Sequence, residues 1–254
     1  MKMVKRIRKA VGKRFRKGKR HLRKFWRSFD RNVIFPVGEN CLADRILGRY
    51  GLKSFSSPCS SGRSNIEYVL AFEKEEFRDF LNPEFLRYGF FEGRKAVQNR
   101  KYVEVSNAYR PSVTNGFELP HHDVIGDRRQ YKALKRRCER LTHLKHRNVI
   151  MLYYHGLCAE TDMRLLVSHI VQLEEIYRNR GNTVHAFVFS QVIVPDRRDR
   201  KMEKETVDGV HLYRFYTNRE WSNGSDDNDP DLFWAVCDDD LLAGMADDIR
   251  RCRI

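Results

Sequence analysis

A cysteine at the start of an expected helix is the residue of this chain best suited to nucleophilic chemistry. The apolar residues 33–35 predict a strand, the run Val-Gly-Glu-Asn-Cys at 37–41 predicts a tight turn, and residues 40–50 predict a helix. Backbone N–H groups at a helix N-terminus are unpaired and carry partial positive charge, so they favour a thiolate over a thiol. The pattern therefore indicates that Cys41 is a nucleophile. The alternative is a small buried hydrophobic residue, as most free cysteines are.

Two adjacent histidines are the leading candidates for the base that such a thiol requires. His121 and His122 follow a Pro-bounded segment and precede an expected helix at 127–143. An imidazole can accept the thiol proton, and a carboxylate or amide can hold the ring in one tautomer. Asp123 is a candidate for that third role, although a turn, a helix cap or a bond to the other histidine suits an adjacent residue better. The alternative is a surface loop with two capping polar residues.

Two further predictions complete the expected site. The backbone N–H of Cys41 and the side chain of Asn40 are the expected oxyanion donors, because both lie at the helix start. His155 ends an expected buried strand at 149–154, where α/β proteins place functional side chains, and it is an alternative base. A structural role for His155 is the competing interpretation.

The order of the expected elements predicts one α/β domain over residues 31–254. Continuous apolar runs at 149–154 and 184–189 are typical of buried strands, and the alternating run at 210–215 suits an edge strand. This order favours a single mixed sheet covered by helices. The expected helices lie at 40–50, 64–73, 74–81, 127–143, 160–178 and 232–251.

Residues 1–30 form a basic arm that dominates the net charge. The chain carries +15, and the segment before Asp30 holds fourteen Lys/Arg and no acidic residue. Its apolar residues recur mostly at three or four positions, which predicts an amphipathic helix suited to the anionic inner face of a plasma membrane. A solvated tail or subunit contact is the first alternative, and nucleic-acid binding is less favoured. The residues expected to bind the anionic surface include Lys5, Arg8, Lys9, Arg16, Arg23 and Trp26.

The sequence gives no reason to expect a metal or a cofactor. The six cysteines are scattered without a CxxC pair or the Cys/His spacing of structural zinc, which favours free thiols in a reducing, cytoplasmic compartment. The acidic residues at 226–231 lack the glycine and the closing glutamate of a calcium loop. Neither phosphate-binding glycine motif is present, and no apolar run is long enough to span a membrane.

Together these motifs resemble those of the bacterial putative papain-like cysteine peptidases, a family of unknown function. The resemblance lies in the Gly-Glu-Asn-Cys run at 38–41, the Tyr-Gly-Leu-Lys turn at 50–53, the His-Asp pair at 122–123, and a helix with Tyr131 and Arg136-Arg137. It covers roughly residues 33–190. It implies Cys41 as the nucleophile and His122 as the base. It also makes an α+β papain-like arrangement the alternative fold.

One departure from the family bears on activity. After the proline the family usually reads Phe-Asp-Trp, whereas this chain has Cys59-Ser60-Ser61. If that Asp orients the histidine, activity would be reduced or lost here. We expect a cysteine-dependent hydrolase or acyltransferase with a peptide, acyl or glycan-linked substrate. The alternatives are a non-catalytic, membrane-peripheral scaffold or pseudoenzyme, and a nucleic-acid-binding protein that uses the arm.

Overall fold

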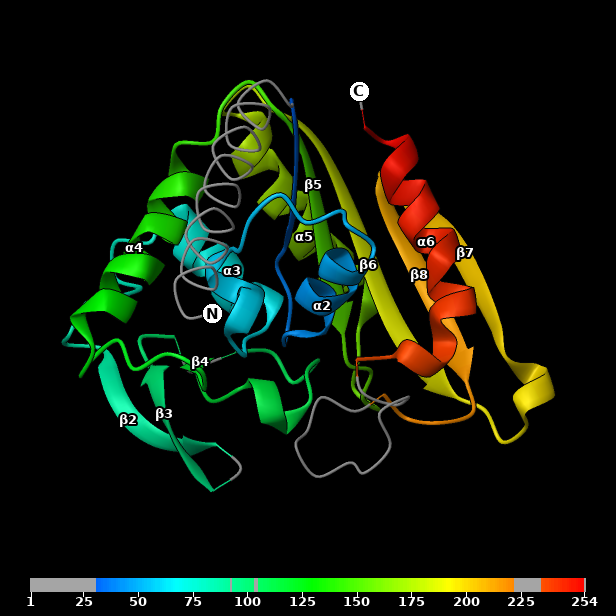
Figure 1. Ribbon diagram of the computed structural model, residues 1–254, viewed down its shortest axis with the longest axis horizontal. Helices are drawn as coiled ribbons and strands as arrows, with labels where there is room; N and C mark the ends of the chain where they lie inside the picture. The colour runs from blue at the N-terminus through cyan, green and yellow to red at the C-terminus, as the bar shows by residue number, and fades with distance from the viewer. Residues whose placement is uncertain (1–30, 92, 103–104, 222–233, 254) are drawn as a thin grey trace, which may run out of the picture. The chain divides into compact units, whose positions relative to one another are not determined.

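A five-stranded mixed sheet is the centre of the fold (Figure 1). The computed structural model describes residues 31–91, 93–102, 105–221 and 234–253. The strand order is β1-β5-β6-β8-β7, in which the first four strands are parallel and β7 is an antiparallel edge strand. The carboxyl ends of the parallel strands therefore meet at one side of the sheet. The strands are β1 (Asn32–Pro36), β5 (Asn148–His155), β6 (Thr183–Ile193), β7 (Lys201–Val207) and β8 (Val210–Thr217).

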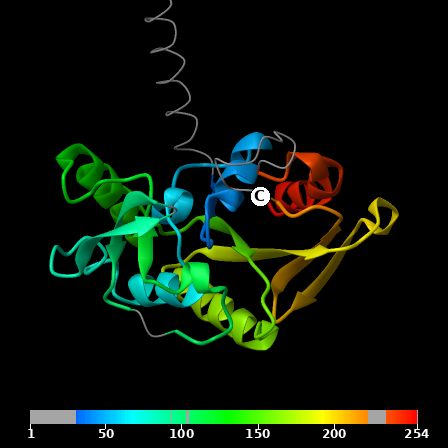
Figure 2. The ribbon, with the colours of Figure 1, turned by 90° about the horizontal axis from the view of Figure 1, so that it is seen from below.

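Helices cover both faces of this sheet, and each face has its own apolar core. The strands alternate: Val33 and Phe35 of β1 contribute to one core, while Ile34 contributes to the other. The first core is covered by α3 (Ile66–Lys74), α4 (Arg128–Thr142) and α5 (Met163–Arg178). The second is covered by α2 (Leu42–Arg49) and α6 (Asp239–Arg251), which lie above the sheet in Figure 2 while α5 lies below it. The prediction of a mixed sheet covered by helices in a single α/β domain is confirmed.

A small second sheet carries the loop with the paired histidines. It consists of β2 (Leu86–Phe91), β3 (Arg94–Asn99) and β4 (Phe117–Leu119), which pair in that order and antiparallel. Phe117 of β4 anchors it, because its ring lies edge-on to that of Phe80 at 4.7 Å. In the described part of the chain there are also four short 3₁₀ helices: η1 (Pro58–Ser61), η2 (Pro111–Val113), η3 (Arg197–Asp199) and η4 (Val236–Asp238).

Local capping explains where the longer helices begin. The carboxylate of Asp127 accepts hydrogen bonds from the N–H groups of Arg129 and Gln130 at the start of α4. Asp162 does the same for Arg164 and Leu165 in α5. Each cap pairs N–H groups that the first turn of a helix leaves without partners.

Two of the expected elements are wrong. Residues 75–81 form turns instead of the predicted helix 74–81, because Glu76 and Phe77 adopt left-handed conformations with φ of 52° and 59°. The strand predicted at 210–215 exists as β8, but it is an internal strand because β7 covers its outer edge. The predictions for the arm 1–30 and the acidic residues 226–231 lie outside the described residues.

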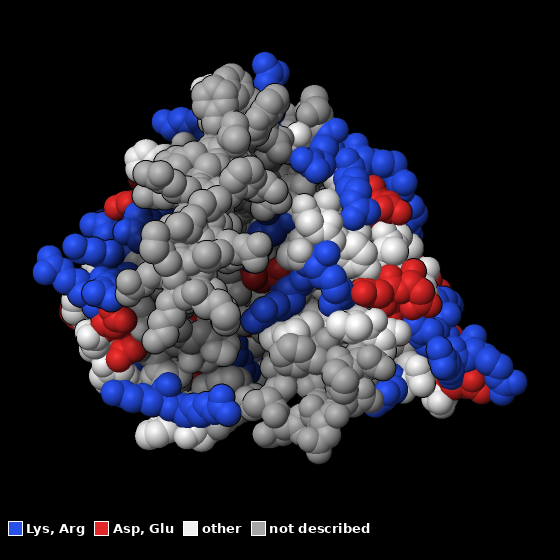
Figure 3. Space-filling view, in the orientation of Figure 1, with Lys and Arg blue, Asp and Glu red and all other residues white. Residues whose placement is uncertain are grey.

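The described surface carries unevenly distributed charge. Lys and Arg side chains gather over α4, at the left of Figure 3, whereas the region of α6 and β7 at the right carries both signs. Among the described helices, none is long and apolar enough to cross a membrane.

Candidate active site

Cys41 lies where β1 passes into α2, at the carboxyl side of the parallel sheet. The N–H of Val37 still donates to the carbonyl of Leu152 in β5 (3.0 Å), and Cys41 then occupies the N-cap position of α2. Gly38 allows this turn, because a Cβ there would lie 2.9 Å from the backbone nitrogen of Tyr154. The predicted order of a strand, a tight turn and a helix is confirmed; the helix expected over 40–50 spans Leu42–Arg49, with Cys41 as its N-cap.

Hydrogen-bond donors gather beside this cysteine. The side-chain oxygen of Asn40 accepts the N–H of Leu42 at 2.8 Å, so Asn40 helps to start the helix. Within the described residues, neither the Asn40 amide nitrogen nor the N–H of Cys41 has a hydrogen-bond acceptor. Both donors are therefore available to a ligand, and their role as oxyanion donors stays a prediction.

The environment of the Cys41 thiol opposes its ionisation. The residue is only 8 % exposed. Burial, and then the negative charge of Asp44, raise the pKa of the thiol to about 11, while the positive charges of Arg45 and Arg63 act in the opposite direction. Burial disfavours the charged form of any acid. The thiol is therefore protonated at neutral pH, despite its place at a helix N-terminus, and attack by its sulfur requires a base.

His122 lies half-buried after β4 and already has a partner. Its Nε2 lies 2.6 Å from the hydroxyl oxygen of Ser61, and Nη1 of Arg137 donates to that hydroxyl at 3.3 Å. Burial, followed by the charge of Arg137, lowers the pKa of His122 below its ordinary value, although the side chain of Gln130 acts in the opposite direction. The imidazole is thus neutral at neutral pH and can accept a proton.

Asp123 and His121 occupy more exposed positions. The Asp123 carboxylate accepts hydrogen bonds from the hydroxyl of Tyr88 (3.0 Å) and from the N–H of Gly126 (2.8 Å). The bond from Gly126 is the main reason that the pKa of Asp123 is lowered. Within the described residues, Asp123 makes no hydrogen bond to either histidine. Its visible contacts are those of a turn residue ahead of α4, and its role beside His122 stays a prediction.

Residues 57–64 connect the cysteine turn to the histidine loop. The N–H of Ser64 donates to the carbonyl of Glu39 at 3.1 Å, and Ser61, three residues earlier, contacts His122. Within the described residues, no hydrogen bond joins Cys41 to His122. The pairing of these two residues therefore also stays a prediction.

Two pockets flank this segment. The first, of about 220 Å³, is lined by both neighbours of Cys41 (Asn40 and Leu42), by Gly156 after β5, and by Arg63 and Arg110. It lies beyond the carboxyl ends of parallel strands, where open α/β sheets bind their ligands. The second pocket, of about 290 Å³, contains the histidine loop; its lining includes Lys95, His121, His122, Asp123 and Gln130.

Comparison with protein families identifies the chain. Residues 32–195 match the family described as "Putative papain-like cysteine peptidase (DUF1796)". The chain belongs to this family. Neither the curated proteins nor the solved structures gave a match. The family resemblance seen in the sequence is therefore confirmed, and it supports a cysteine hydrolase at the level of the family.

In this member of the family, the segment Cys59-Ser60-Ser61 has a clear structural role. The hydroxyl of Ser60 accepts the N–H of Ser57 at 2.9 Å in a capping box that starts η1. The hydroxyl of Ser57 donates to the carbonyl of Pro36 at the end of β1 (2.6 Å). Ser61 makes the contact with His122. Ser60 thus supports the backbone, and Ser61 is the residue of this segment that contacts the histidine.

His155, the alternative base, belongs to a buried polar cluster centred on Glu39. His155 is 1 % exposed; its Nδ1 lies 2.8 Å from Glu39 Oε1, and its Nε2 lies 3.2 Å from the hydroxyl of Thr161. The Glu39 carboxylate also accepts hydrogen bonds from the hydroxyl of Tyr153 (3.1 Å) and the N–H of Gly156 (2.8 Å). Both ring nitrogens of His155 are engaged, which favours its structural role.

Several residues at this site were not predicted from the sequence. Glu39 lies inside the Gly-Glu-Asn-Cys run. Its position as an acidic residue between apolar segments was the signal that could have identified it as a buried hydrogen-bond acceptor. Ser61, Arg63 and Arg110 could not be placed, because the short helix η1 and the irregular segments around it and before η2 bring them to the site.

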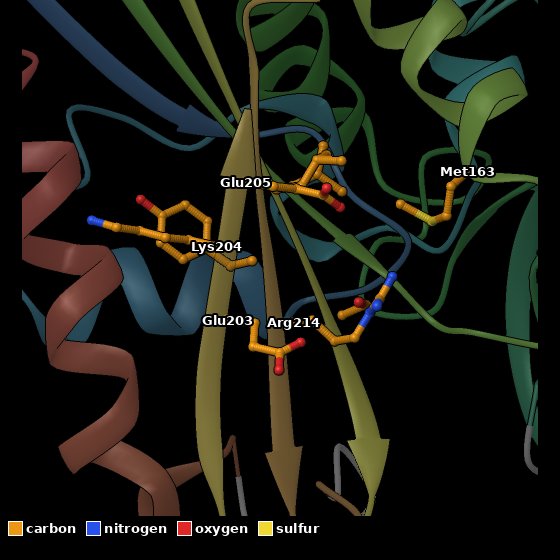
Figure 4. A pocket seen from close by; sticks show the side chains of 9 residues that line it. Met163, Glu203, Lys204, Glu205 and Arg214 are labelled. Atoms are coloured by element: carbon orange, nitrogen blue, oxygen red, sulfur yellow. The ribbon is translucent and has the colours of Figure 1, made fainter. Parts of the chain in front are cut away.

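A third pocket, of about 330 Å³, contains none of the predicted site residues. It lies over β6, β8 and β7, between Met163 and the side chains of Glu203, Glu205 and Arg214. Figure 4 shows that Lys204 points to the opposite face of β7, toward α6. Its lining contains no cysteine and no histidine, so the pocket is not a candidate for the predicted Cys–His site.

Proposed function

We propose that this protein is a cysteine-dependent acyl hydrolase in which Cys41 is the nucleophile and His122 is the base. The observation that carries the proposal is the position of Cys41 at the N-cap of α2, beside two hydrogen-bond donors without acceptors and next to a polar pocket. Family membership supports the same reaction class. The substrate is an acyl compound, either a peptide or an acylated or glycan-linked ester.

The reaction proceeds by concerted proton transfer, because both partners are neutral at rest. The Cys41 sulfur attacks the substrate carbonyl carbon while its proton passes to the imidazole of His122. The N–H of Cys41 and the amide of Asn40 donate to the oxyanion of the tetrahedral intermediate. The imidazolium then protonates the leaving amine or alcohol, and water, deprotonated by the same imidazole, hydrolyses the thioester and restores the thiol.

Ser61 controls how the proton reaches His122. The Ser61 hydroxyl lies 2.6 Å from Nε2 of His122. The thiol proton of Cys41 therefore reaches His122 either through this hydroxyl or by direct transfer after the Ser61 side chain rotates away. Ser61→Ala separates these routes: a relay predicts a loss of kcat, whereas direct transfer predicts that activity is kept or raised.

The test uses acyl-reporter substrates, namely a panel of p-nitrophenyl esters and aminocoumarin peptides. Cys41→Ala and His122→Ala are expected to abolish turnover, and the matched controls Cys158→Ala and His143→Ala to retain it. In the wild type, kcat/KM should rise with pH through a value below the ordinary 6.5 of histidine, because the pKa of His122 is lowered. Unchanged turnover in Cys41→Ala would overturn the proposal.

Ser61 itself is a second candidate nucleophile. Its 2.6 Å contact with His122 is a direct serine–imidazole pair, and Arg137 could stabilise negative charge on the attacking oxygen. A fluorophosphonate probe tests this alternative. Labelling of Ser61 that is lost in Ser61→Ala and His122→Ala, but kept in Cys41→Ala, would favour a serine hydrolase.

The arm of residues 1–30 carries a separate proposal. We propose that it binds anionic bilayers and holds the protein at a membrane surface, which its fourteen cations and apolar stripe support. Sedimentation with phosphatidylserine vesicles, but not with neutral vesicles, is the expected result. Retention on duplex or single-stranded DNA in its place would favour nucleic-acid binding. Absence of turnover on every substrate of the panel would favour the non-catalytic scaffold alternative for the folded domain.

A further inference from the structure

Two histidines and a cysteine meet at the end of the sheet opposite Cys41. His185 lies near the start of β6, His211 near the start of β8, and Cys252 at the C-cap of α6. One ligand atom of each lies within 4.8 Å of those of the other two, and all three residues are half-buried. This cluster is near the amino ends of the parallel strands, whereas Cys41 follows the carboxyl end of β1. It is therefore separate from the proposed active site.

The sheet register explains why the two histidines face each other. β6 and β8 are neighbouring parallel strands, with Phe187 opposite His211. Phe187 contributes to the core under α6, and His185, two residues away, shares its face. The hydroxyl of Tyr213, on the face of His211, donates to Asp248 of α6. Both imidazoles thus point toward α6, whose last turn brings Cys252 to them.

The donor set matches the preferences of zinc. Imidazole nitrogen and thiolate sulfur are its usual protein ligands, at about 2.0–2.1 Å and 2.3 Å respectively. A tetrahedral site with those bond lengths has ligand atoms roughly 3.3–3.7 Å apart. Because the three donors lie within 4.8 Å of one another, side-chain rotations that shift them by about 1–1.5 Å at most bring them to that spacing. Because the cluster is half-buried, water can supply the fourth ligand.

The surroundings hold the donors in place for a cation. The Nδ1 of His211 lies 3.3 Å from the hydroxyl of Thr206, and the Phe187 ring lies 4.6 Å from the imidazole. Such a bond at one ring nitrogen orients the other nitrogen toward a metal. The carbonyl of Cys252 accepts the side chain of Asn148 at 2.7 Å, which fixes the end of α6 on β5. A helix C-terminus also carries partial negative charge, which favours a cation.

Nearby positive charges are partly compensated. Lys204 and Arg251, which approach this end of α6, share one carboxylate, that of Asp248, in two ion pairs. Their repulsion of a divalent ion is therefore reduced.

We propose that His185, His211 and Cys252 form a Zn²⁺ site that ties the C-terminus of α6 to strands β6 and β8. The ligands come from three elements far apart in the sequence, so no spacing motif reveals them. The site is structural and does not depend on the activity proposed for Cys41.

The experiment measures metal binding by the full chain after chelation and desalting. Zn²⁺ affinity is measured by competition with a chromophoric chelator, and Co²⁺ serves as a spectroscopic probe of thiolate ligation. We expect one tight site per chain, a thiolate-to-cobalt absorption band, and a higher thermal midpoint with Zn²⁺. Cys252→Ala should lose the band, and His185→Gln and His211→Gln should weaken Zn²⁺ binding by at least the roughly 10- to 100-fold that loss of an outer-shell partner costs.

Two control variants make the test specific. Cys237→Ala and His143→Ala remove a half-buried thiol and an exposed imidazole outside the cluster, and both should bind like the wild type. Circular dichroism checks the fold of each variant; Cys252→Ser replaces Cys252→Ala if the latter does not fold. The proposal is overturned if the wild type binds no Zn²⁺ above the background of the cluster variants, or if Cys252→Ala and Cys252→Ser retain the cobalt–thiolate band.

Discussion

The reactivity of Cys41 toward an alkylating agent provides a quantitative test of its environment. Burial, reinforced by Asp44, raises the pKa of the thiol to about 11. At pH 7 such a thiol is ionised to roughly one part in ten thousand, against about 3 % for an ordinary thiol of pKa 8.5. Since only the thiolate reacts, we expect Cys41 in the native protein to react with iodoacetamide roughly 300-fold more slowly than a free thiol at that pH.

The assay follows alkylation of Cys41 by mass spectrometry from pH 6 to 11. The rate should rise about tenfold per pH unit and level off only near pH 11. Asp44→Asn removes a negative charge and should shift this profile to lower pH, while the control Asp247→Asn, an exposed residue of α6, should leave it unchanged. His122→Ala should also leave it unchanged, because no thiolate–imidazolium pair exists at rest. A plateau below pH 8.5 that moves upward in His122→Ala would refute this reasoning.

Three further predictions concern the stability of the fold. Gly38→Ala should destabilise the protein by about 1–3 kcal/mol, because its Cβ would meet the backbone of Tyr154, and urea unfolding would show this. Burial raises the pKa of Glu73 to about 7, so stability should fall as pH rises from about 4.5 through 7, by up to about 3 kcal/mol, and Glu73→Gln should flatten this dependence in thermal scans. Asp162→Ala should cost about 1 kcal/mol in the same scans, because α5 loses its cap.

Each of these changes has a matched control. Gly48→Ala should be neutral or stabilising, because a Cβ there meets nothing within 4 Å; an equal loss in both glycine variants would contradict the argument for Gly38. Asp162→Asn keeps a capping oxygen and should behave nearly as the wild type. For Glu73, the sign follows from its raised pKa: the folded state holds a proton that the unfolded state releases above about pH 4.5, so folding is favoured at low pH. Stability that instead rises through this range in the wild type, but not in Glu73→Gln, would contradict it.

Regular patterns made much of the fold predictable. β5 is a continuous apolar run, and α5 begins at an Asp cap and repeats its apolar residues with helical spacing, so both followed from local sequence. The strand β7 did not, because its seven residues are mostly charged and exposed and lack an apolar face. Residues 74–81 have a pattern that favours a helix, but Glu76 and Phe77 adopt left-handed conformations that end it. Tertiary packing determines such a turn, so local sequence does not predict it.

The turn that leads to Cys41 could be predicted from the sequence, whereas the residues that surround Cys41 in the folded protein could not. The turn before Cys41 follows from Gly38 and Asn40, both local features. The raised pKa of the thiol depends on burial by segments distant in sequence, which no local pattern gives. The contact between Ser61 and His122 likewise depends on how η1 and the loop after β4 approach each other.

The buried carboxylate of Glu39 makes the turn before Cys41 a pre-organised structure. Glu39 lies two positions before Cys41, and three groups at the end of β5 contact its carboxylate. They are the hydroxyl of Tyr153, the imidazole of His155 and the N–H of Gly156. The backbone that presents the N–H of Cys41 is therefore ordered during folding, before any substrate arrives. Little reorganisation energy remains to oppose charge development on a bound acyl group. Loops that line the pocket can then vary to accept different substrates while the turn keeps one geometry.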